Sequence, residues 1–542
     1  MVRRIVKIVA FFVIGIMLFF AVQGIFIPKW YSDGATNRVL SGFFALENDT
    51  AEVLFLGTSH MGRGVSPMKI YEDTGIVSYN LATSGQPLEC SYFLLKEAFK
   101  TQSPKVVFLD AGRILNGEGN NNNSYWRYII DNFPRDEVFW ELVEAYSELP
   151  DSDGSLAAWF PLIKYHSRWD QLTEESFESR FTGGYYSAGQ YIMPYSSPYA
   201  PSQQVFDEKV AQISEESVTT IRAAEEGVLS AKAVKKDGYA PELTGHCMEY
   251  VLKIKSLCEE NGAELVIVKI PSYTYSGLIM SDSNAGDYSW NILKSDLLRA
   301  FTDENDIRFI DMMYDVNIVD SLFDTHDSGH LNVNGAEKVS AFIEKILRQY
   351  HISPNTNEKY DENLEKYRLV STVAKLQSER DFHQYLETLS ENAGNWLILI
   401  SACDEYTYSL DSQDFDSMEK LGLHLVQGGN FRDAYVAVIN SGNVLYEAVS
   451  EGPISYETVL CNQKIKLYSG GGNNFSTCNI LLEGKDYSNG CRGLNFVVID
   501  KETNLVIDAA SFDTFSESKT FTRAVNETNT RLRAYESAIC FQ

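Results

Sequence analysis

Short apolar runs bounded by glycine, proline or polar residues recur in the first two thirds of the chain. Such runs are typical of strands buried on both faces of a parallel sheet. Between or after them, the segments 88–100, 247–263 and 334–350 carry apolar residues at helical spacing instead. The alternation predicts an α/β domain with a parallel sheet. The predicted strands are 52–57, 76–82, 105–110, 264–271 and 308–312.

A long segment, roughly 112–240, interrupts this rhythm. It is rich in Tyr, Ser and Asn, as in "NNNNSYW" and "GGYYSAGQYIMPYSSPYAP". Two interpretations stay open for this insertion, a cap that faces substrate and a set of ordered surface loops.

A second domain is predicted after a polar stretch rich in Pro, Asn and Glu. We assign this stretch as a linker at 351–370, with the exposed start of a helix as the alternative. Within 371–542, strands are expected at 395–405 and 434–442, a short helix at 417–423, and a hairpin that turns at 501–504. We expect this α+β, β-rich domain to fold alone, with the segment around Trp396 near Asn495.

The first thirty residues predict a membrane anchor. Arg3, Arg4 and Lys7 precede the apolar stretch 8–28, which is long enough to cross a hydrocarbon core of about 30 Å. A secretory signal has a shorter apolar region, so an uncleaved signal anchor is favoured over a cleaved signal. The preceding cations place the tail 1–7 in the cytoplasm and the bulk of the chain outside the cell membrane.

The composition restricts the classes of partner and ligand that the chain can bind. The chain has 542 residues, 44% of them hydrophobic, and a formal charge of −28, so no basic face exists to neutralise nucleic-acid phosphates. Eight cysteines occur without a C-x-x-C pair, which argues against a zinc site of that type. Four of them follow residue 460, and one or two disulfides are expected there in an oxidising exterior.

The candidate chemistry lies where the first strand ends, in "GTSH", because ligands of open α/β sheets bind beyond the carboxyl ends of the strands. A nucleophilic Ser59 needs a base and an orienting carboxylate, and "DSGH" supplies Asp327 and His330 just before the last helix of the domain. Alternatives remain: Ser59 as a helix cap, His60 as a packing or turn residue, and a metal site formed by His326 and His330.

At these residues the sequence resembles the SGNH (GDSL-like) hydrolase and acyltransferase superfamily, in particular the membrane-anchored bacterial branch related to D-alanyl transfer and alginate O-acetylation proteins. The resemblance covers roughly 50–350. It is carried by "LGTSH", "YNLATSGQP", "YFLLKEAFKTQSPKVVFLD" and "DSGHLNVNGAEK". It implies a flavodoxin-like, three-layer domain at 29–350.

The resemblance also implies roles for individual residues. Ser59 would be the nucleophile, His330 the general base and acid, and Asp327 its orienter, while the N–H groups of Ser59 and Gly85 would form the oxyanion hole. The third block departs from the family pattern Gly-x-Asn-Asp, because "FLDAGRILNG" offers Asp110 and then Arg113 or Asn116. Asn80 is the substitute donor that we consider, and the departure also leaves a weakened enzyme open.

The C-terminal half resembles the interleukin-like EMT inducer domain, known from a secreted cytokine-like family and from the stem of a mammalian glycosyltransferase, where it contacts carbohydrate. The matching pieces are "WLILISACDEYTYSL", "LGLHLVQGGNFRDAYVAVINSG" and "CRGLNFVVIDKETNLVIDAASFDTF". Their order differs from that of the family, which indicates a circular permutation. The resemblance implies a module that binds glycan or a partner.

Together these observations favour an extracytoplasmic serine esterase or O-acyltransferase that acts on cell-surface or exported polysaccharide. Such acyl transfer needs no cofactor and no metal, but a transferase would require a membrane partner that donates the acyl group. The competing hypothesis is a non-catalytic surface protein that binds glycan or assembles an export complex.

Overall fold

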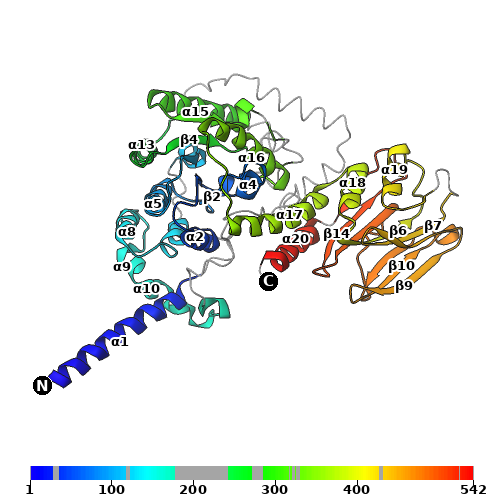
Figure 1. The fold of residues 1–542 in the computed structure, drawn as a ribbon, viewed down its shortest axis with the longest axis horizontal. Coiled ribbons are helices and arrows are strands. Elements are labelled where there is room, and N and C mark those ends of the chain that lie inside the picture. Colours follow the sequence, from blue (N-terminus) through cyan, green and yellow to red (C-terminus); the bar gives the residue numbers. More distant parts are fainter. Residues whose placement is uncertain are drawn as a thin grey trace. The chain divides into compact units, whose positions relative to one another are not determined.

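The computed structural model describes residues 2–28, 36–117, 123–177, 242–271, 285–316, 318–319, 324, 330–425, 431–523 and 525–540. The described residues up to Glu365 form one compact unit, and those from Lys366 onward form a second (Figure 1). Helix α17 (Glu358–Ser378) runs across this boundary, so part of the segment expected as a linker is helical. Tyr360 of this helix is fully buried, and its hydroxyl donates to the Ser78 carbonyl at 2.7 Å.

The first unit is built on a five-stranded parallel sheet. Its order is β2-β1-β3-β4-β5, the order of flavodoxin-like folds. Each apolar run that predicted a strand contains one, and the predicted α/β class is confirmed. The strands are β1 (Val53–Leu56), β2 (Ser78–Asn80), β3 (Val106–Asp110), β4 (Glu264–Lys269) and β5 (Arg308–Asp311).

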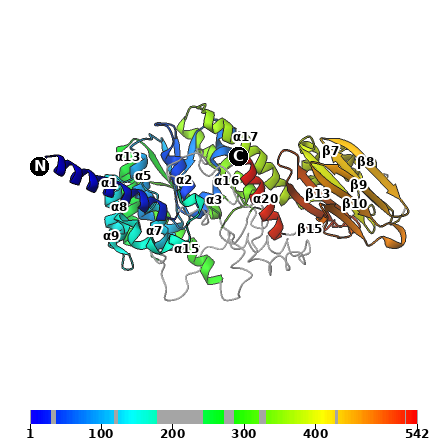
Figure 2. The same ribbon diagram turned by 90° about the horizontal axis from the view of Figure 1, so that it is seen from below.

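Helices cover both faces of this sheet, which explains why its strands are continuously apolar (Figure 2). Leu54 and Leu56 belong to the core on one face, whereas Val53 and Phe55 belong to the core on the other. The first face packs against α2 (Thr36–Phe44), α5 (Leu88–Ala98), α8 (Glu137–Ser147) and α13 (Gly245–Glu260). The second packs against α3 (Ser59–Gly64), α4 (Pro67–Thr74) and α16 (Val333–Leu347). Helix α15 (Ala285–Glu304) precedes β5.

The described part of the insertion is helical and joins the core of the first unit. Trp126 and Tyr146 are buried there, and a buried ion pair joins Arg127 and Asp131 at 2.6 Å. Residues 118–122 and 178–241 lie outside the described residues. The helices are α6 (Gly112–Asn116), α7 (Asn123–Ile130), α9 (Gly154–Trp159), α10 (Pro161–Tyr165) and two 3-10 helices, η2 (His166–Asp170) and η3 (Glu174–Phe177).

The second unit is a two-sheet structure with helices. A six-stranded sheet has the order β15-β14-β13-β6-β7-β8, a four-stranded sheet has the order β12-β11-β10-β9, and one apolar cluster is shared between them. The strands are β6 (Trp396–Cys403), β7 (Ala434–Asn440), β8 (Asn443–Ser450), β9 (Ile454–Leu460), β10 (Gln463–Ser469), β11 (Cys478–Leu482), β12 (Lys485–Asp486), β13 (Gly493–Asp500), β14 (Val506–Phe512) and β15 (Phe521–Arg523).

The predicted pairings in this unit are present. Strand β6 starts at Trp396 and pairs with β13, which contains Asn495, and β13 and β14 form the expected hairpin. The accompanying helices are α18 (Phe382–Asn392), α19 (Ser412–Lys420) and α20 (Val525–Cys540). Phe382 and Tyr385 of α18 lie against Phe512 of β14. The centroid of the Phe512 ring is 5.1 Å from that of Phe382 and 5.0 Å from that of Tyr385.

The cysteines differ from expectation. Among the described residues, seven cysteines are free thiols, including Cys461, Cys478 and Cys491 near the C-terminus. The Cys403 thiol donates to the Gly490 carbonyl at 4.0 Å. The expected C-terminal disulfide is therefore absent from this set of residues.

Candidate active site

The turn that carries Ser59 begins with a glycine that the packing requires. Gly57 follows β1 with φ +143°, and a Cβ on it would lie 2.3 Å from the Cβ of Asp110 at the end of β3. Any other residue would therefore clash with the neighbouring strand and adopt a backbone conformation unfavourable for L-residues. The close approach brings the turn directly over the carboxyl end of the sheet.

Thr58 fastens this turn to β3. Its hydroxyl donates to Asp110 Oδ2 at 2.7 Å and accepts from the His60 backbone N–H at 3.3 Å, so that Thr58 is the N-cap of α3. Asp110 is 3% exposed and also accepts from the Gly112 N–H at 3.1 Å. The carboxylate is thus a buried anchor for the turn.

Ser59 is the first residue of α3, and its hydroxyl meets His330. The distance between Ser59 Oγ and His330 Nε2 is 2.8 Å, although 271 positions separate the two residues. A hydroxyl and an imidazole nitrogen at this distance can exchange a proton. The structure therefore brings together the predicted nucleophile and the predicted base.

His330 is held by the start of α16. Asn332 caps this helix by accepting from the Gly335 N–H at 3.1 Å, and its own N–H donates to the Asp324 carbonyl at 3.0 Å. Asp324 is buried and pairs with Lys338 at 2.5 Å. Asp327 and His326 lie outside the described residues, so the role of Asp327 as orienter stays a prediction.

His60 lies beside the pair. Its ring stacks on the ring of His330, with centroids 5.5 Å apart and planes inclined by 24°. His60 Nδ1 is 3.1 Å from the Thr58 hydroxyl. Since that hydroxyl donates its single hydrogen to Asp110, Nδ1 carries the hydrogen of this contact.

Gly85 lies on the loop after β2, and this loop is tied to the Ser59 turn because the Thr83 N–H donates to the Gly57 carbonyl at 3.2 Å. Gly85 has φ +59°, and a Cβ on it would lie 2.4 Å from the ring of Tyr125. Arg113 Nη2 donates to the Gly85 carbonyl, and its guanidinium lies 5.6 Å from the centre of the Tyr125 ring. Burial lowers the pKa of Arg113.

Asn80 does not fit the donor role that we predicted for it. Its side-chain amide donates to the carbonyls of Met61 and Val65 at 3.0 and 3.2 Å, and its Oδ1 accepts from the Ala82 N–H. Asn80 is fully buried. Because both amide hydrogens bind carbonyls of α3 and its C-cap, Asn80 holds this helix in place and has no hydrogen left to donate to an oxyanion.

The sequence predicts no role in the site for three residues, Thr58, Tyr125 and Arg113. The Thr of "GTSH" could have been recognised as an N-cap, but its bond to Asp110 depends on two adjacent strands. The contact of Tyr125 with Gly85 had no signal, because the insertion holds many tyrosines. Arg113 was noticed only as a departure from the family pattern, and in the structure it binds the Gly85 carbonyl.

Comparisons with known proteins add little to this geometry. No family model matches the chain. No curated protein matches it either. Among solved structures, the chain is similar to one from Bacteroides fragilis described as a candidate acylhydrolase, with a TM-score of 0.27 and 11% identity over 58% of this chain and 94% of that chain. At this TM-score the likeness supports no inference about activity.

Proposed function

We propose that this chain is a serine-dependent acyl-transfer enzyme, an esterase or O-acyltransferase, with Ser59 as nucleophile and His330 as base. The observation that carries the proposal is the 2.8 Å contact between Ser59 Oγ and His330 Nε2. It lies where ligands bind in open α/β sheets, beyond the carboxyl end of β1.

The chemistry follows from these two groups. Ser59 Oγ attacks the carbonyl carbon of an ester while His330 Nε2 takes the hydroxyl proton, and the carbonyl electron pair moves onto the oxygen. The N–H groups of Ser59 and Gly85 donate to this oxyanion. Collapse expels the alcohol, to which His330 returns the proton, and leaves an acyl group on Ser59. Water or a sugar hydroxyl, deprotonated by His330, then attacks the acyl group. As the bond from the acyl carbon to Ser59 Oγ breaks, His330 returns the proton to Ser59.

The setting of the enzyme is part of the proposal. The described residues contain one helix, Arg3–Phe26, long and apolar enough to cross a membrane. We place the tail before it in the cytoplasm and both units outside, where exported or cell-surface polysaccharide is the acyl acceptor or substrate. The family resemblances support this substrate class, and the second unit would hold the glycan or a partner.

A mechanism-based probe tests the proposal. A fluorophosphonate should label Ser59 in the wild-type chain, seen by intact mass and peptide mapping, and Ser59→Ala should abolish both labelling and turnover of p-nitrophenyl acetate. His330→Ala should cost about as much as Ser59→Ala, on the order of 10⁴–10⁶-fold in kcat, and the two losses should not add. Ser103→Ala changes an exposed serine bonded to Asp49 and is the control.

Two outcomes would decide against the enzyme. Labelling of Ser59→Ala at the wild-type rate would show that another residue reacts. If the folded wild type shows neither labelling nor an acyl group on Ser59 in cells that make the polymer, the non-catalytic binding hypothesis takes its place. The acyl-enzyme is sought in cells because a transferase would form it only when the membrane partner that donates the acyl group is present.

A further inference from the structure

The segment 154–177, here called the foot, exposes large apolar side chains although it belongs to a folded unit. It comprises α9, α10 and the two 3-10 helices η2 and η3. Isolated exposed apolar residues are ordinary, but a group of them on one short segment marks an interaction surface. The exposed fractions are 59% for Leu156, 39% for Trp159, 53% for Ile163 and 72% for Trp169.

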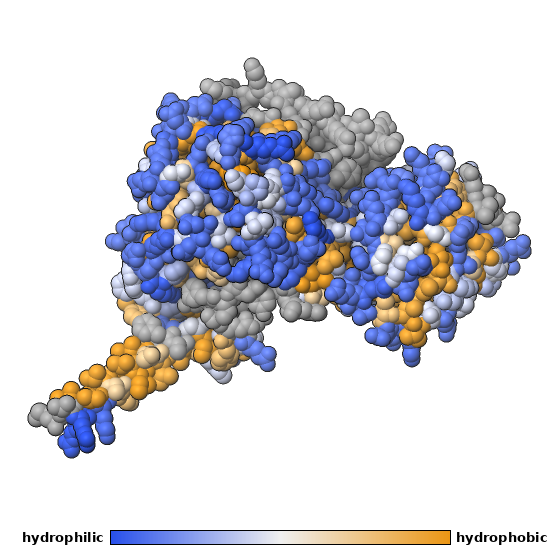
Figure 3. All heavy atoms as spheres, in the orientation of Figure 1, coloured by the Kyte–Doolittle hydropathy of each residue, from blue (hydrophilic) through white to orange (hydrophobic). Residues whose placement is uncertain are grey.

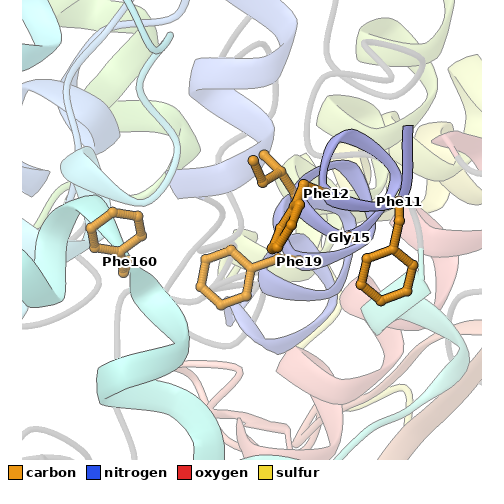
Figure 4. A pocket seen from close by; sticks show the side chains of 6 residues that line it. Phe11, Phe12, Gly15, Phe19 and Phe160 are labelled. Carbon is orange, nitrogen blue, oxygen red and sulfur yellow. The ribbon is translucent and has the colours of Figure 1, made fainter. Parts of the chain in front are cut away.

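The foot lies against helix α1 (Val2–Phe26). Arg168 Nη1 donates to the Phe26 carbonyl at 2.6 Å, and this carbonyl is one of the last four of the helix, which have no partner within it. The rings of Phe160 and Phe19 lie 6.1 Å apart. Figure 4 shows Phe160 across from the phenylalanines of α1, and the open apolar groove there is lined by Phe11, Phe12, Gly15, Ile16, Phe19 and Phe160.

These contacts set the depth of the foot. Phe19 precedes Phe26 by seven residues, which is about 10 Å along the helix axis at 1.5 Å per residue. If α1 crosses a bilayer with Phe26 at the outer surface, Phe160 lies about 10 Å below that surface. Amphipathic interfacial helices bury their apolar face to about 5–10 Å.

The occupant of this surface is best identified as lipid. No residue in the most hydrophobic window of α1 is buried by protein, and hydrophilic residues gather at the free end of this helix (Figure 3). The foot continues this apolar surface laterally and adds two exposed tryptophans, Trp159 and Trp169. Tryptophan is enriched where a membrane meets water, because its ring is apolar and its N–H is polar.

We propose that the foot is a second membrane-contact element, which lies in the outer interface of the bilayer that α1 crosses. This inference rests on the anchor part of the proposed function. Two contacts, one spanning and one lying in the interface, restrict the tilt of the first unit and fix the height of Ser59 above the lipid. The enzyme would then act on acyl groups or glycans at a set distance from the membrane.

Quenching by brominated lipid tests this inference in the full-length chain reconstituted in nanodiscs. Bromine on the acyl chains quenches tryptophans that reach them, so the wild-type signal should fall when brominated phosphatidylcholine replaces the ordinary lipid. In Trp159→Phe/Trp169→Phe the quenched signal should fall below that of the wild type, because both tryptophans of the foot are gone. Trp396→Phe removes a buried tryptophan of the second unit and should leave the quenched signal unchanged.

A second variant guards against misfolding, and an extraction separates the two proposals. Ile163→Asp keeps both tryptophans and should lower their quenching by placing a charge in the interface. If quenching is equal in the wild type and the double variant while the chain is retained in carbonate-washed membranes, the proposal that the foot contacts lipid is wrong. The proposal that α1 anchors the chain is then unaffected. If carbonate releases the chain, both the proposal of a membrane anchor and the proposal that the foot contacts lipid are wrong. A surface covered by protein would give the same signal in both lipids, which also overturns the inference.

Discussion

Gly85→Ala is the most informative substitution near the site, because the structure predicts two separable costs. Gly85 has φ +59°, where an L-residue costs about 1–2 kcal/mol. Its new Cβ would also lie 2.4, 2.4 and 2.6 Å from three ring atoms of Tyr125. Overpacking of this kind costs about 1–3 kcal/mol, so the variant should lose about 2–5 kcal/mol of unfolding free energy in all.

A second glycine of the same unit isolates the backbone cost. Gly262 has φ +72°, and a Cβ on it would meet nothing within 4 Å. Gly262→Ala should therefore lose only about 1–2 kcal/mol. Adding Tyr125→Ala to Gly85→Ala should remove the overpacking cost, which gives a coupling energy of about 1–3 kcal/mol in a double-mutant cycle.

The assays are urea denaturation for stability and the rate of Ser59 labelling for function. Displacement of the Gly85 N–H should slow labelling by about 10²–10³-fold, the effect of losing one oxyanion donor, whereas Gly262→Ala should label normally. The reasoning is refuted if Gly85→Ala destabilises no more than Gly262→Ala, or if the coupling with Tyr125→Ala is below about 0.5 kcal/mol.

Two further predictions concern buried charges. Burial, and then Asp73, raise the pKa of Glu344 from 4.5 to about 7 in the folded chain, so its ionisation destabilises the fold as the pH rises through this range. Glu344→Gln should thus add about 1 kcal/mol to the free energy of unfolding at pH 8 and nothing below pH 4.5, measured by urea titrations at each pH. Arg523, 4% exposed, bonds the fully buried Asp508 at 2.9 Å, so Arg523→Gln should cost about 3–5 kcal/mol of stability in the second unit. The half-exposed Arg492→Gln should cost at most about 1 kcal/mol, and equal losses for both arginines would contradict this view.

The elements themselves could be predicted from the sequence because their causes are local. Leu54 and Leu56 face one core and Val53 and Phe55 the other, which is why the first strand is an unbroken apolar run. The helix period of 334–350 likewise comes from one face of α16 that packs on the sheet, where Val339 and Ile343 are fully buried. Ser59 and His330 could be proposed as a pair from the sequence because each stands in a recognisable short motif.

The rest of the site depends on close approaches between distant segments, which no local pattern records. The amide of Asn80 turned out to bind α3 because α3 folds back over the end of β2. The fit of Gly85 against Tyr125 joins a loop to helix α7, 40 positions away, and the bond from Thr58 to Asp110 spans 52 positions. The contact of the foot with α1 is likewise between distant segments, because it joins Arg168 to Phe26, 142 positions away. Hydrophobic periodicity determines which face of an element is buried, but packing in three dimensions decides which polar groups then meet.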